Sequence, residues 1–307
     1  MKRSIPLSLS FLLLCSCQGT SSIVEKSTVD ISIKTSFSSE DKEFRVLTWN
    51  IYLGKGKGEN FVYTIKENDP DIIHLQEAKG AYENFISPLL KDISDYSLIN
   101  DSIVDDVPVC STPIIFRKSK FELVDYGAER LKDAYQGNDT KTLSYVVLQE
   151  KKSEKLLFDF CFHGAIISNK YDGYQDKTKE ECVEISKQMR TKNVQQILDK
   201  LDALQTTYGK ACEIITGDCN FDSTSDAYGL LMKENFTDSE QSALLYKNTE
   251  GLQTSHTMGE YPNQGLSIDH IFGRNGTTFL SQDIIRTQLS LDASDHDPVI
   301  ADVYLNE

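Results

Sequence analysis

Basic side chains are scarce in this 307-residue chain, which has 32 Lys and Arg against 47 Asp and Glu and a formal net charge of −15. Proteins that coat nucleic acid regardless of its sequence need clustered Lys and Arg, so the charge disfavours this class of function. An enzyme that reaches a few phosphates through a bound metal ion remains compatible with it. A solvated acidic surface is the alternative explanation for the excess of carboxylates.

Long apolar runs, closely spaced cysteine pairs and linkers are also missing. No segment reaches the roughly 20 apolar residues that a membrane-spanning helix needs, and the absence of a C-x-x-C pair argues against a zinc ribbon. Residues 44–307 contain no repeat and no Pro/Gly/Ser-rich linker, so we expect one domain there. Five cysteines follow residue 17, an odd number that leaves at least one thiol free. Cys161 and Cys212 lie in strand-like runs and are expected to be packed thiols.

The N-terminus has the features of an export signal. Lys2 and Arg3 precede a largely apolar stretch, residues 5–14, which is too short to span a bilayer core of about 30 Å. The next residues, Leu14-Cys15-Ser16-Cys17, resemble a bacterial lipobox. In such a motif the cysteine that follows a small residue is lipidated and becomes the new N-terminus.

We therefore expect residues 1–16 to be a lipoprotein signal peptide, with Cys17 lipidated and residues 17–43 forming a tether. An ordinary cleaved signal is the alternative. Removal of residues 1–16 takes away two basic residues and no acidic one, which brings the net charge to −17. The mature protein would then be exported and anchored to a membrane, or secreted.

Short apolar strands and helical stretches make up the chain from residue 44 onward. Strands are predicted at residues 44–50, 71–77, 113–116, 121–126, 143–149, 156–163, 212–216, 267–272 and 298–305, and helices at 60–67, 81–90 and 180–204. The strands cluster as hairpins between a few helices, which disfavours a parallel doubly wound sheet. The pattern predicts a layered α/β sandwich formed by one domain, residues 44–307.

Polar groups stand at the ends of several of these apolar strands. They are Asn50, Glu77, His163, Asp218-Cys219-Asn220 and Asp295-His296. Each has an ordinary structural explanation when taken alone: a loop cap, a hydrogen-bonded core histidine or a turn. Strand ends commonly present ligands to one edge of a sheet, so the set as a whole suggests a shared site.

The order of the polar motifs resembles that of a known family. The motifs are Thr48-Trp49-Asn50, Leu75-Gln76-Glu77, Gly217-Asp218-Cys219-Asn220, Ile268-Asp269-His270 and Ser294-Asp295-His296-Asp297-Pro298-Val299. Together they resemble the endonuclease/exonuclease/phosphatase superfamily, which has the deoxyribonuclease-I-like fold, over roughly residues 44–305. The resemblance implies a four-layer α/β/β/α sandwich with two packed mixed β-sheets. It also implies a metal-dependent phosphoric ester hydrolase.

Phosphate-ester hydrolysis needs an in-line nucleophile and neutralisation of charge on the phosphoryl oxygens. Hard oxygen ligands suit Mg²⁺ or Mn²⁺. Glu77 is the leading metal ligand, and Asn50 would support it or bind the metal through its amide oxygen. Asp295 would be a further ligand, directly or through water.

His296 is the expected general base, because an imidazole titrates near neutral pH. The resemblance makes Asp269 its partner, since a carboxylate on one ring nitrogen fixes the tautomer. Asp218 would position or activate the attacking water, and Asn220 would bind the substrate phosphate.

His163 falls where family members carry a Thr-His-Leu motif and contact the phosphate as a donor or an acid. Here the motif reads Phe162-His163-Gly164, so only the histidine is kept. In related nucleases a second acid often pairs with this histidine. The stretch before Arg117 offers Cys110, Ser111 and Thr112 and no carboxylate for that pairing.

Several substrates and functions stay open. A nucleic-acid phosphodiester comes first, as in a nuclease, then a phospholipid head group as in a sphingomyelinase, then an inositol or sugar phosphate. The candidate phosphate contacts for DNA are Lys55, Lys57, Arg117, Lys118 and Lys120, with solvated loop residues as the alternative. A catalytically retired binding lipoprotein is the rival from another class, and a secreted eukaryotic enzyme with sequons at Asn138, Asn235 and Asn275 is a further alternative. We expect a monomer.

Overall fold

The structure, a computed structural model, describes residues 36–100, 110–131, 141–248, 253–260 and 266–306. All of them except Ser36 belong to one compact unit, Phe37–Glu307. The expected signal peptide, Cys17 and most of the tether lie outside the described residues. Within the described ranges, no helix is both long and apolar enough to cross a membrane.

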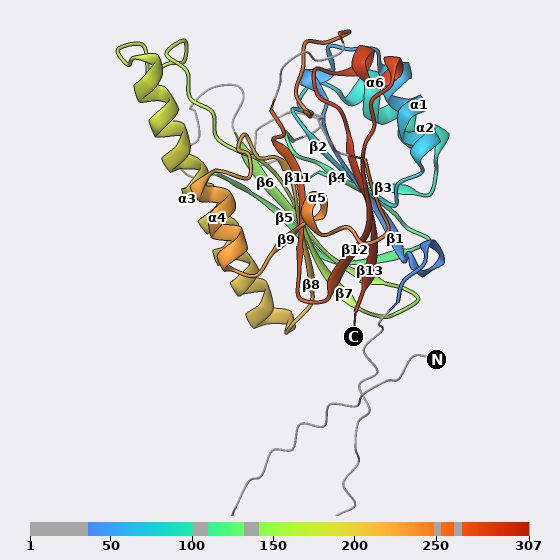
Figure 1. Ribbon diagram of the computed structural model, residues 1–307. Coiled ribbons are helices and arrows are strands. Elements are labelled where there is room, and N and C mark those ends of the chain that lie inside the picture. The colour runs from blue at the N-terminus through green and yellow to red at the C-terminus, as the bar shows by residue number, and fades with distance from the viewer. Residues whose placement is uncertain (1–35, 101–109, 132–140, 249–252, 261–265, 307) are drawn as a thin grey trace, which may run out of the picture. The chain divides into compact units, whose positions relative to one another are not determined.

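Two mixed β-sheets form the centre of this unit (Figure 1). Among the described residues, the seven-stranded sheet runs in the order β10 (Tyr246–Asn248), β12 (Thr277–Ile284), β13 (Val299–Leu305), β1 (Phe44–Asn50), β2 (Ile72–Gln76), β4 (Ile114–Arg117) and β3 (Tyr96–Ile99). The six-stranded sheet runs in the order β5 (Phe121–Arg130), β6 (Thr142–Glu150), β7 (Leu156–His163), β8 (Cys212–Asp218), β11 (Asp269–Arg274) and β9 (Thr237–Asp238).

Helices cover the outer face of each sheet (Figure 1). The helices α1 (Gly58–Asn68), η3 (Tyr82–Ile86), α2 (Ser87–Asp92) and α6 (Gln288–Ala293) accompany the seven-stranded sheet, and α3 (Lys179–Tyr208) and α4 (Asp226–Lys233) accompany the six-stranded one. Three short helices complete the described set: η1 (Ser39–Asp41), η2 (Tyr52–Gly54) and α5 (Ser239–Ser242).

Buried apolar side chains fill all three interfaces between the layers. Phe61 and Phe85 pack with Trp49 between α1, η3 and the seven-stranded sheet. Phe44 and Phe121 meet edge to face, with ring centroids 5.3 Å apart, in the cluster between the two sheets. Residues of α3 and α4 bury the outer face of the six-stranded sheet. The predicted α/β/β/α sandwich with two packed mixed sheets is therefore confirmed.

The structure also corrects several expected elements. The helix predicted at residues 81–90 is a π-helical turn, η3, followed by α2. No element was predicted between residues 216 and 267, but this stretch contains α4, β9, α5 and β10; β3, β12 and α6 were not predicted either. These elements are short, so few of them are long enough to show a repeating pattern of apolar residues. The helix α4, for example, has only eight residues and includes Gly229. It begins with a cap in which Ser225 Oγ accepts the Tyr228 N–H at 3.1 Å. Cys161 and Cys212 are buried thiols that form no disulfide, as expected.

Strand direction explains how the polar motifs meet. The parallel strands β1 and β2 end at the same edge, with Asn50 beside Gln76, and the parallel strands β7 and β8 end together with His163 beside Asp218. Antiparallel β11 begins at Asp269, opposite Asp218. Asn50 at the end of β1 contacts Asp218 at the end of β8, so these ends lie on the same side of the sandwich.

Candidate active site

Asn50 joins the two sheets at the site. Its Nδ2 donates to Asp218 Oδ2 at 2.9 Å and to Glu77 Oε1 at 3.3 Å, while its Oδ1 accepts the Tyr52 N–H at 3.0 Å. The amide nitrogen therefore faces the carboxylates, and the amide oxygen is occupied by the backbone. Of the two roles that the sequence left open for Asn50, this geometry favours support of Glu77 over direct metal binding.

The backbone is strained where it presents these groups. Leu53, Glu77 and Asn220 have φ values of 55°, 54° and 53°, in the left-handed region that residues other than glycine seldom adopt. All three line the same cavity. Strained backbone of this kind clusters at functional sites, where the surrounding fold holds it in place.

His296 and Asp269 form the expected pair. Nδ1 of His296 and Oδ2 of Asp269 lie 2.8 Å apart, and both residues are buried. This contact directs the second ring nitrogen, Nε2, toward Asp218 Oδ2 at 3.8 Å. The main chain is fixed as well, because Trp49 Nε1 donates to the His296 carbonyl at 2.7 Å and Ser294 Oγ donates to the Asn50 carbonyl at 2.6 Å.

Burial and charged neighbours shift the pKa values of His296 and Asp218 at this site. Burial alone would lower the pKa of His296, but Asp269, Asp218 and Asp295 raise it to about 10. Burial alone would raise the pKa of Asp218, but His163, His296 and the charge of Lys141 hold it well below its usual value. Asp218 is thus a carboxylate at neutral pH. His296 is protonated until further positive charge enters the site.

The structure adds a residue that the sequence did not single out. Lys141 directly precedes β6, its side chain is buried, and its Nζ donates to His163 Nε2. The same Nε2 lies 3.3 Å from Asp218 Oδ2. Among the described residues, the side chains beside His163 Nε2 are thus this lysine and Asp218. A lysine before a strand has no distinguishing pattern, so only the strand pairing could have revealed it.

Asn220 and Gly164 hold the ends of β7 and β8 together. Asn220 Nδ2 donates to the Gly164 carbonyl at 3.1 Å, and the Asn220 main chain donates to Asp218 Oδ1 at 3.0 Å. An amide nitrogen carries two hydrogens, so one remains for a phosphate oxygen. Arg190 of α3 donates to the Asn220 carbonyl and fixes this turn from outside.

The carboxylates fit a divalent cation. Asp295 Oδ1 is buried without a hydrogen-bond partner among the described residues. Burial raises the pKa of the Asp295 carboxyl, the charge of His296 lowers it, and the neighbouring Glu77 raises it further. The charge of Glu77 thus reaches Asp295, and carboxylate oxygens are the hard donors that Mg²⁺ or Mn²⁺ prefers. Glu77 and Asp295 would hold such an ion.

Another group of potential metal ligands does not fit a metal ion. Asp238, Glu240 and His270 offer ligand atoms within 4.8 Å of one another. However, His270 Nδ1 is bonded to Asp238 Oδ2 at 2.9 Å and Nε2 to the Phe221 carbonyl at 3.1 Å. Neither nitrogen retains a lone pair for a metal, so this group is a structural ion pair.

The site residues surround a cavity of about 270 Å³. Its lining consists of Leu53, Glu77, Ser111, Lys141, His163, Ile166, Tyr171, Asp218, Asn220 and His296. Asn50 and Asp269 lie behind this surface and orient residues that reach it. The structure thus brings most of the sequence-predicted site residues to one cavity; Asp295 directly precedes His296 but is not part of the lining.

A family model fits this chain. The model describes the Endonuclease/Exonuclease/phosphatase family and matches residues 47–296, more than half of the chain. The chain belongs to this family. Members of the family are hydrolases that act on phosphate esters. No curated protein matches the chain.

Solved structures of the endonuclease/exonuclease/phosphatase family share the fold. A family protein from Bacteroides vulgatus is 20% identical, with 86% of this chain and 99% of that one covered and a TM-score of 0.69. A mannosyl-6-phosphatase from Bacteroides thetaiotaomicron is 18% identical, with 85% and 100% covered and a TM-score of 0.67. The human nocturnin catalytic domain with bound sulfate is 19% identical, with 86% and 94% covered and a TM-score of 0.59. At these identities the likeness shows the fold alone.

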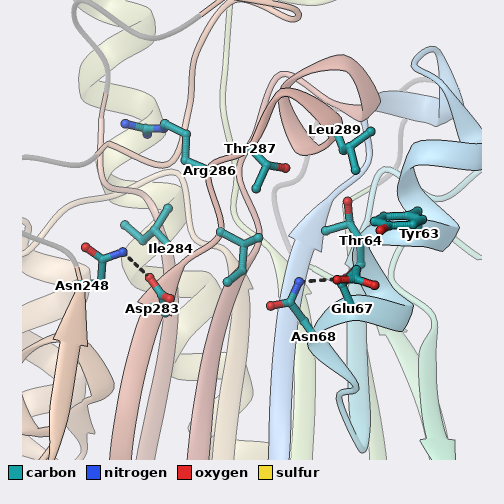
Figure 2. Close-up of a pocket in the computed structure, with 11 residues that line it drawn as sticks. Tyr63, Thr64, Glu67, Asn68, Asn248, Asp283, Ile284, Arg286, Thr287 and Leu289 are labelled. Atoms are coloured by element: carbon teal, nitrogen blue, oxygen red, sulfur yellow. Dashed lines mark hydrogen bonds between the residues drawn. The ribbon is translucent and has the colours of Figure 1, made fainter.

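A larger cavity of about 600 Å³ lies away from the candidate active site, between α1 and the segment after β12 (Figure 2). Glu67 and Asp283 line it, and Asn248 Nδ2 donates to Asp283 Oδ1 at 2.7 Å. Its Arg286 binds Asp297 Oδ2 through Nε at 2.8 Å. The described lining contains no histidine, so this cavity offers no general base of the kind found beside Asp218.

Proposed function

We propose that this protein is a divalent-metal-dependent hydrolase of phosphate esters. The observation that carries the proposal is the His296–Asp269 pair, whose free ring nitrogen faces Asp218 beside the carboxylates of Glu77 and Asp295. A base, a water-positioning carboxylate and a hard cation site at one cavity are what phosphoryl transfer to water requires.

The residues of the chain define a hydrolytic step. A water molecule held by Asp218 attacks phosphorus, and its proton passes to His296 Nε2. The bond between phosphorus and the ester oxygen breaks, and that oxygen takes a proton from solvent. Asp269 stabilises the imidazolium that forms, and the remaining N–H of Asn220 meets a phosphoryl oxygen. A divalent cation at Glu77 and Asp295 would neutralise phosphoryl charge and favour the unprotonated form of His296.

The positions of the basic residues bear on the substrate class. Arg117 binds Asp71 at 3.3 Å and Lys120 binds Asp71 at 2.8 Å, at the start of β2, whereas Glu77 follows its end. These side chains are thus at the sheet edge opposite the site. Three lysines considered for DNA remain. Lys57 and Lys55 are engaged locally, by the Asp292 carboxylate and the Tyr52 ring, and Lys118 directly follows Arg117 at the end of β4. A nucleic-acid phosphodiester therefore loses its main support, and a small phosphate ester fits the cavity better.

We further propose export and anchoring through lipidated Cys17, supported by the signal-like N-terminus and the lipobox resemblance. A tethered hydrolase would meet its substrate outside the cytoplasm. Mass spectrometry of the mature N-terminus tests this, because an unmodified N-terminus elsewhere would contradict it.

The test of the hydrolase function uses the full-length protein. It should hydrolyse p-nitrophenyl phosphate or a member of a panel of plasmid DNA, RNA, sphingomyelin, inositol phosphates and mannose 6-phosphate. Chelation should abolish the activity, and Mg²⁺ or Mn²⁺ should restore it. His296→Gln should lower kcat by about 100-fold or more, because the base is lost. Glu77→Gln should weaken restoration by metal, whereas Glu67→Gln, in the other cavity, should behave as wild type.

Rescue by zinc alone would contradict the oxygen-ligand site. A folded protein without activity on any panel member would favour the retired binding lipoprotein. Circular dichroism of each variant checks that the fold is kept.

A further inference from the structure

His296 and Asp269 belong to segments of different sheets. His296 lies between α6 and β13, a strand of the seven-stranded sheet, and Asp269 begins β11 in the six-stranded sheet. The hydrogen bonds within each sheet therefore do not fix the distance of 2.8 Å between His296 Nδ1 and Asp269 Oδ2. Other contacts must hold the two segments in register.

The segment that includes Thr254 and Ser255 contacts both of them. The Thr254 carbonyl accepts the Asp297 N–H at 2.8 Å, and Ser255 forms a β-bridge with His296. On the other side, Thr254 Oγ1 accepts the Asp269 N–H at 3.2 Å. Thr254 is fully buried. This segment is thus a physical link between the candidate base and its carboxylate.

Arg286 ties this link to the segment of the base. Its Nε donates to Asp297 Oδ2 at 2.8 Å, and its Nη2 lies 2.8 Å from the same oxygen and donates to the Gln253 carbonyl. One guanidinium thus holds both the residue after His296 and the residue before Thr254. Although Arg286 lines the larger cavity, its guanidinium points away from the acidic side chains of that cavity (Figure 2).

Burial makes the ion pair of Arg286 and Asp297 resistant to opening. The side chain of Asp297 is 0% exposed and that of Arg286 is 12% exposed. Separation of such a pair leaves an uncompensated charge in the interior, which is costly. Asp297 is therefore held firmly, and so is the adjacent His296. A base depends on such firmness, because a displacement of about 1 Å can lower a rate by about 100-fold.

We infer that Arg286 and Asp297 are positioning residues, whose ion pair holds the His296 imidazole against Asp269. Neither residue lines the candidate active-site cavity, so both act through His296. The inference rests on the proposed hydrolase function for its kinetic consequence, whereas the orientation of the ring can be measured without a substrate.

Paired substitutions test this on the full-length protein. Arg286→Met with Asp297→Asn removes both charges, so that neither is left buried and unmatched. The matched control is Arg274→Met with Glu213→Gln. Arg274 and Glu213 form another ion pair, with side chains 11% and 0% exposed. They face each other at the end of the β8–β11 pairing that lies away from the site.

The kinetic measurement uses Mg²⁺ and p-nitrophenyl phosphate, or another ester of the panel that is hydrolysed. The Arg286/Asp297 variant should lower kcat by about 10- to 100-fold and leave KM nearly unchanged, because the base acts in the chemical step. The control variant should be less stable but keep the wild-type kcat. Arg286→Lys, which keeps a charge beside Asp297, should give an intermediate kcat. An unchanged kcat, an equal loss in the control, or a loss confined to KM overturns the inference.

Nuclear magnetic resonance of the histidine rings separates this inference from the hydrolase function. The N–H between His296 and Asp269 should give a downfield imidazole signal, which is assigned by its loss in His296→Gln. This signal should shift or broaden in the Arg286/Asp297 variant, whereas the signal of His270 should stay, and the control should change neither. If no ester is hydrolysed but the His296 signal responds in this way, the inference stands and the hydrolase function fails. If the His296 signal is unchanged in the variant, or absent from the wild type, the inference fails.

Discussion

The buried histidines His270 and His296 are each hydrogen-bonded to an aspartate through Nδ1, but they differ at the second ring nitrogen. His270 uses both ring nitrogens, one on Asp238 and one on the Phe221 carbonyl, and both partners are acceptors. The ring is therefore an imidazolium with no nitrogen left for a substrate. His296 is hydrogen-bonded to Asp269 through Nδ1, whereas its Nε2 lies 3.8 Å from Asp218 Oδ2, beyond hydrogen-bond distance, beside the cavity. The group at the second nitrogen thus separates a structural ion pair from a candidate base.

The charge of His270 predicts a dependence of stability on pH. Burial alone would lower the pKa of His270, but Asp238 and Glu240 raise it above its ordinary value. The folded state then binds the proton more tightly than the unfolded chain, where the pKa is about 6.5. The contribution is complete below about pH 6.5 and is lost as the pH rises through the folded value. His270→Gln should therefore lower the free energy of unfolding more at about pH 6 than at about pH 9.

Urea unfolding of wild type and variant at both pH values measures this. Titrating groups far from His270 cancel in the difference, and the difference therefore reports His270 together with its neighbours Asp238 and Glu240. An equal loss at both values would mean that the ring is not charged in the folded state.

At the level of single residues, the sequence predicted the side chains that belong to recognisable motifs. Glu77, Asp218 and His296 could be predicted from their motifs, because phosphoryl transfer to water needs these residue types. Lys141 could not be predicted, because its role depends on the pairing of β6 with β7, which brings it to His163 from 22 residues away. The orientation of the Asn50 amide likewise depends on a backbone contact that no motif encodes.

The junction of β7 and β8 shows how elements position the site. A Cβ atom on Gly164 would lie 2.1 Å from the Cys219 carbonyl oxygen, so no side chain fits there. Gly164 also donates its N–H to the Asp218 carbonyl at 2.8 Å. The close approach keeps His163 beside Asp218, and it explains why a glycine stands where the family motif has a leucine.

Two glycine substitutions should have opposite effects on stability. Gly164→Ala should lower the free energy of unfolding by about 1–3 kcal/mol, because the methyl group forces the backbone of the junction apart. Gly229→Ala should raise it by about 0.5–1 kcal/mol, because this residue lies in α4, a Cβ there meets nothing within 4 Å, and alanine favours helix. Urea unfolding of both variants measures the two changes. A stabilising Gly164→Ala would show that the junction is less tightly packed than described.

Elements with a strong apolar pattern were predictable, and capped short ones were not. The second half of α3 repeats apolar residues from Val194 to Leu204, and central strands such as β8 are buried throughout, so their type follows from the sequence. The π-helical turn η3 ends at Ile86 and α2 begins at Ser87, with no intervening residue that signals the change. The sequence pattern therefore predicts one continuous helix. Edge strands such as β10, with all three residues exposed, have no apolar signal at all.

The whole site exists only because the two sheets pack against each other. Asn50 and Glu77 come from one sheet and His163, Asp218 and Asp269 from the other. A buried polar pair also crosses this interface, since His74 Nε2 on β2 and Asp159 Oδ2 on β7 lie 2.8 Å apart with neither side chain exposed. The inter-sheet core is otherwise mainly apolar.

A double-mutant cycle on this pair should reveal the coupling of the sheets. Asp159→Leu or His74→Leu alone should lower the free energy of unfolding by about 3–5 kcal/mol, because each leaves a polar partner buried and unmatched. The double variant should recover most of that loss, because two apolar side chains replace both partners at once. Urea unfolding of the four proteins gives the interaction free energy. Additive losses would show that the contact adds nothing beyond two separate side chains, and the packing of the sheets would then depend on their apolar cluster alone.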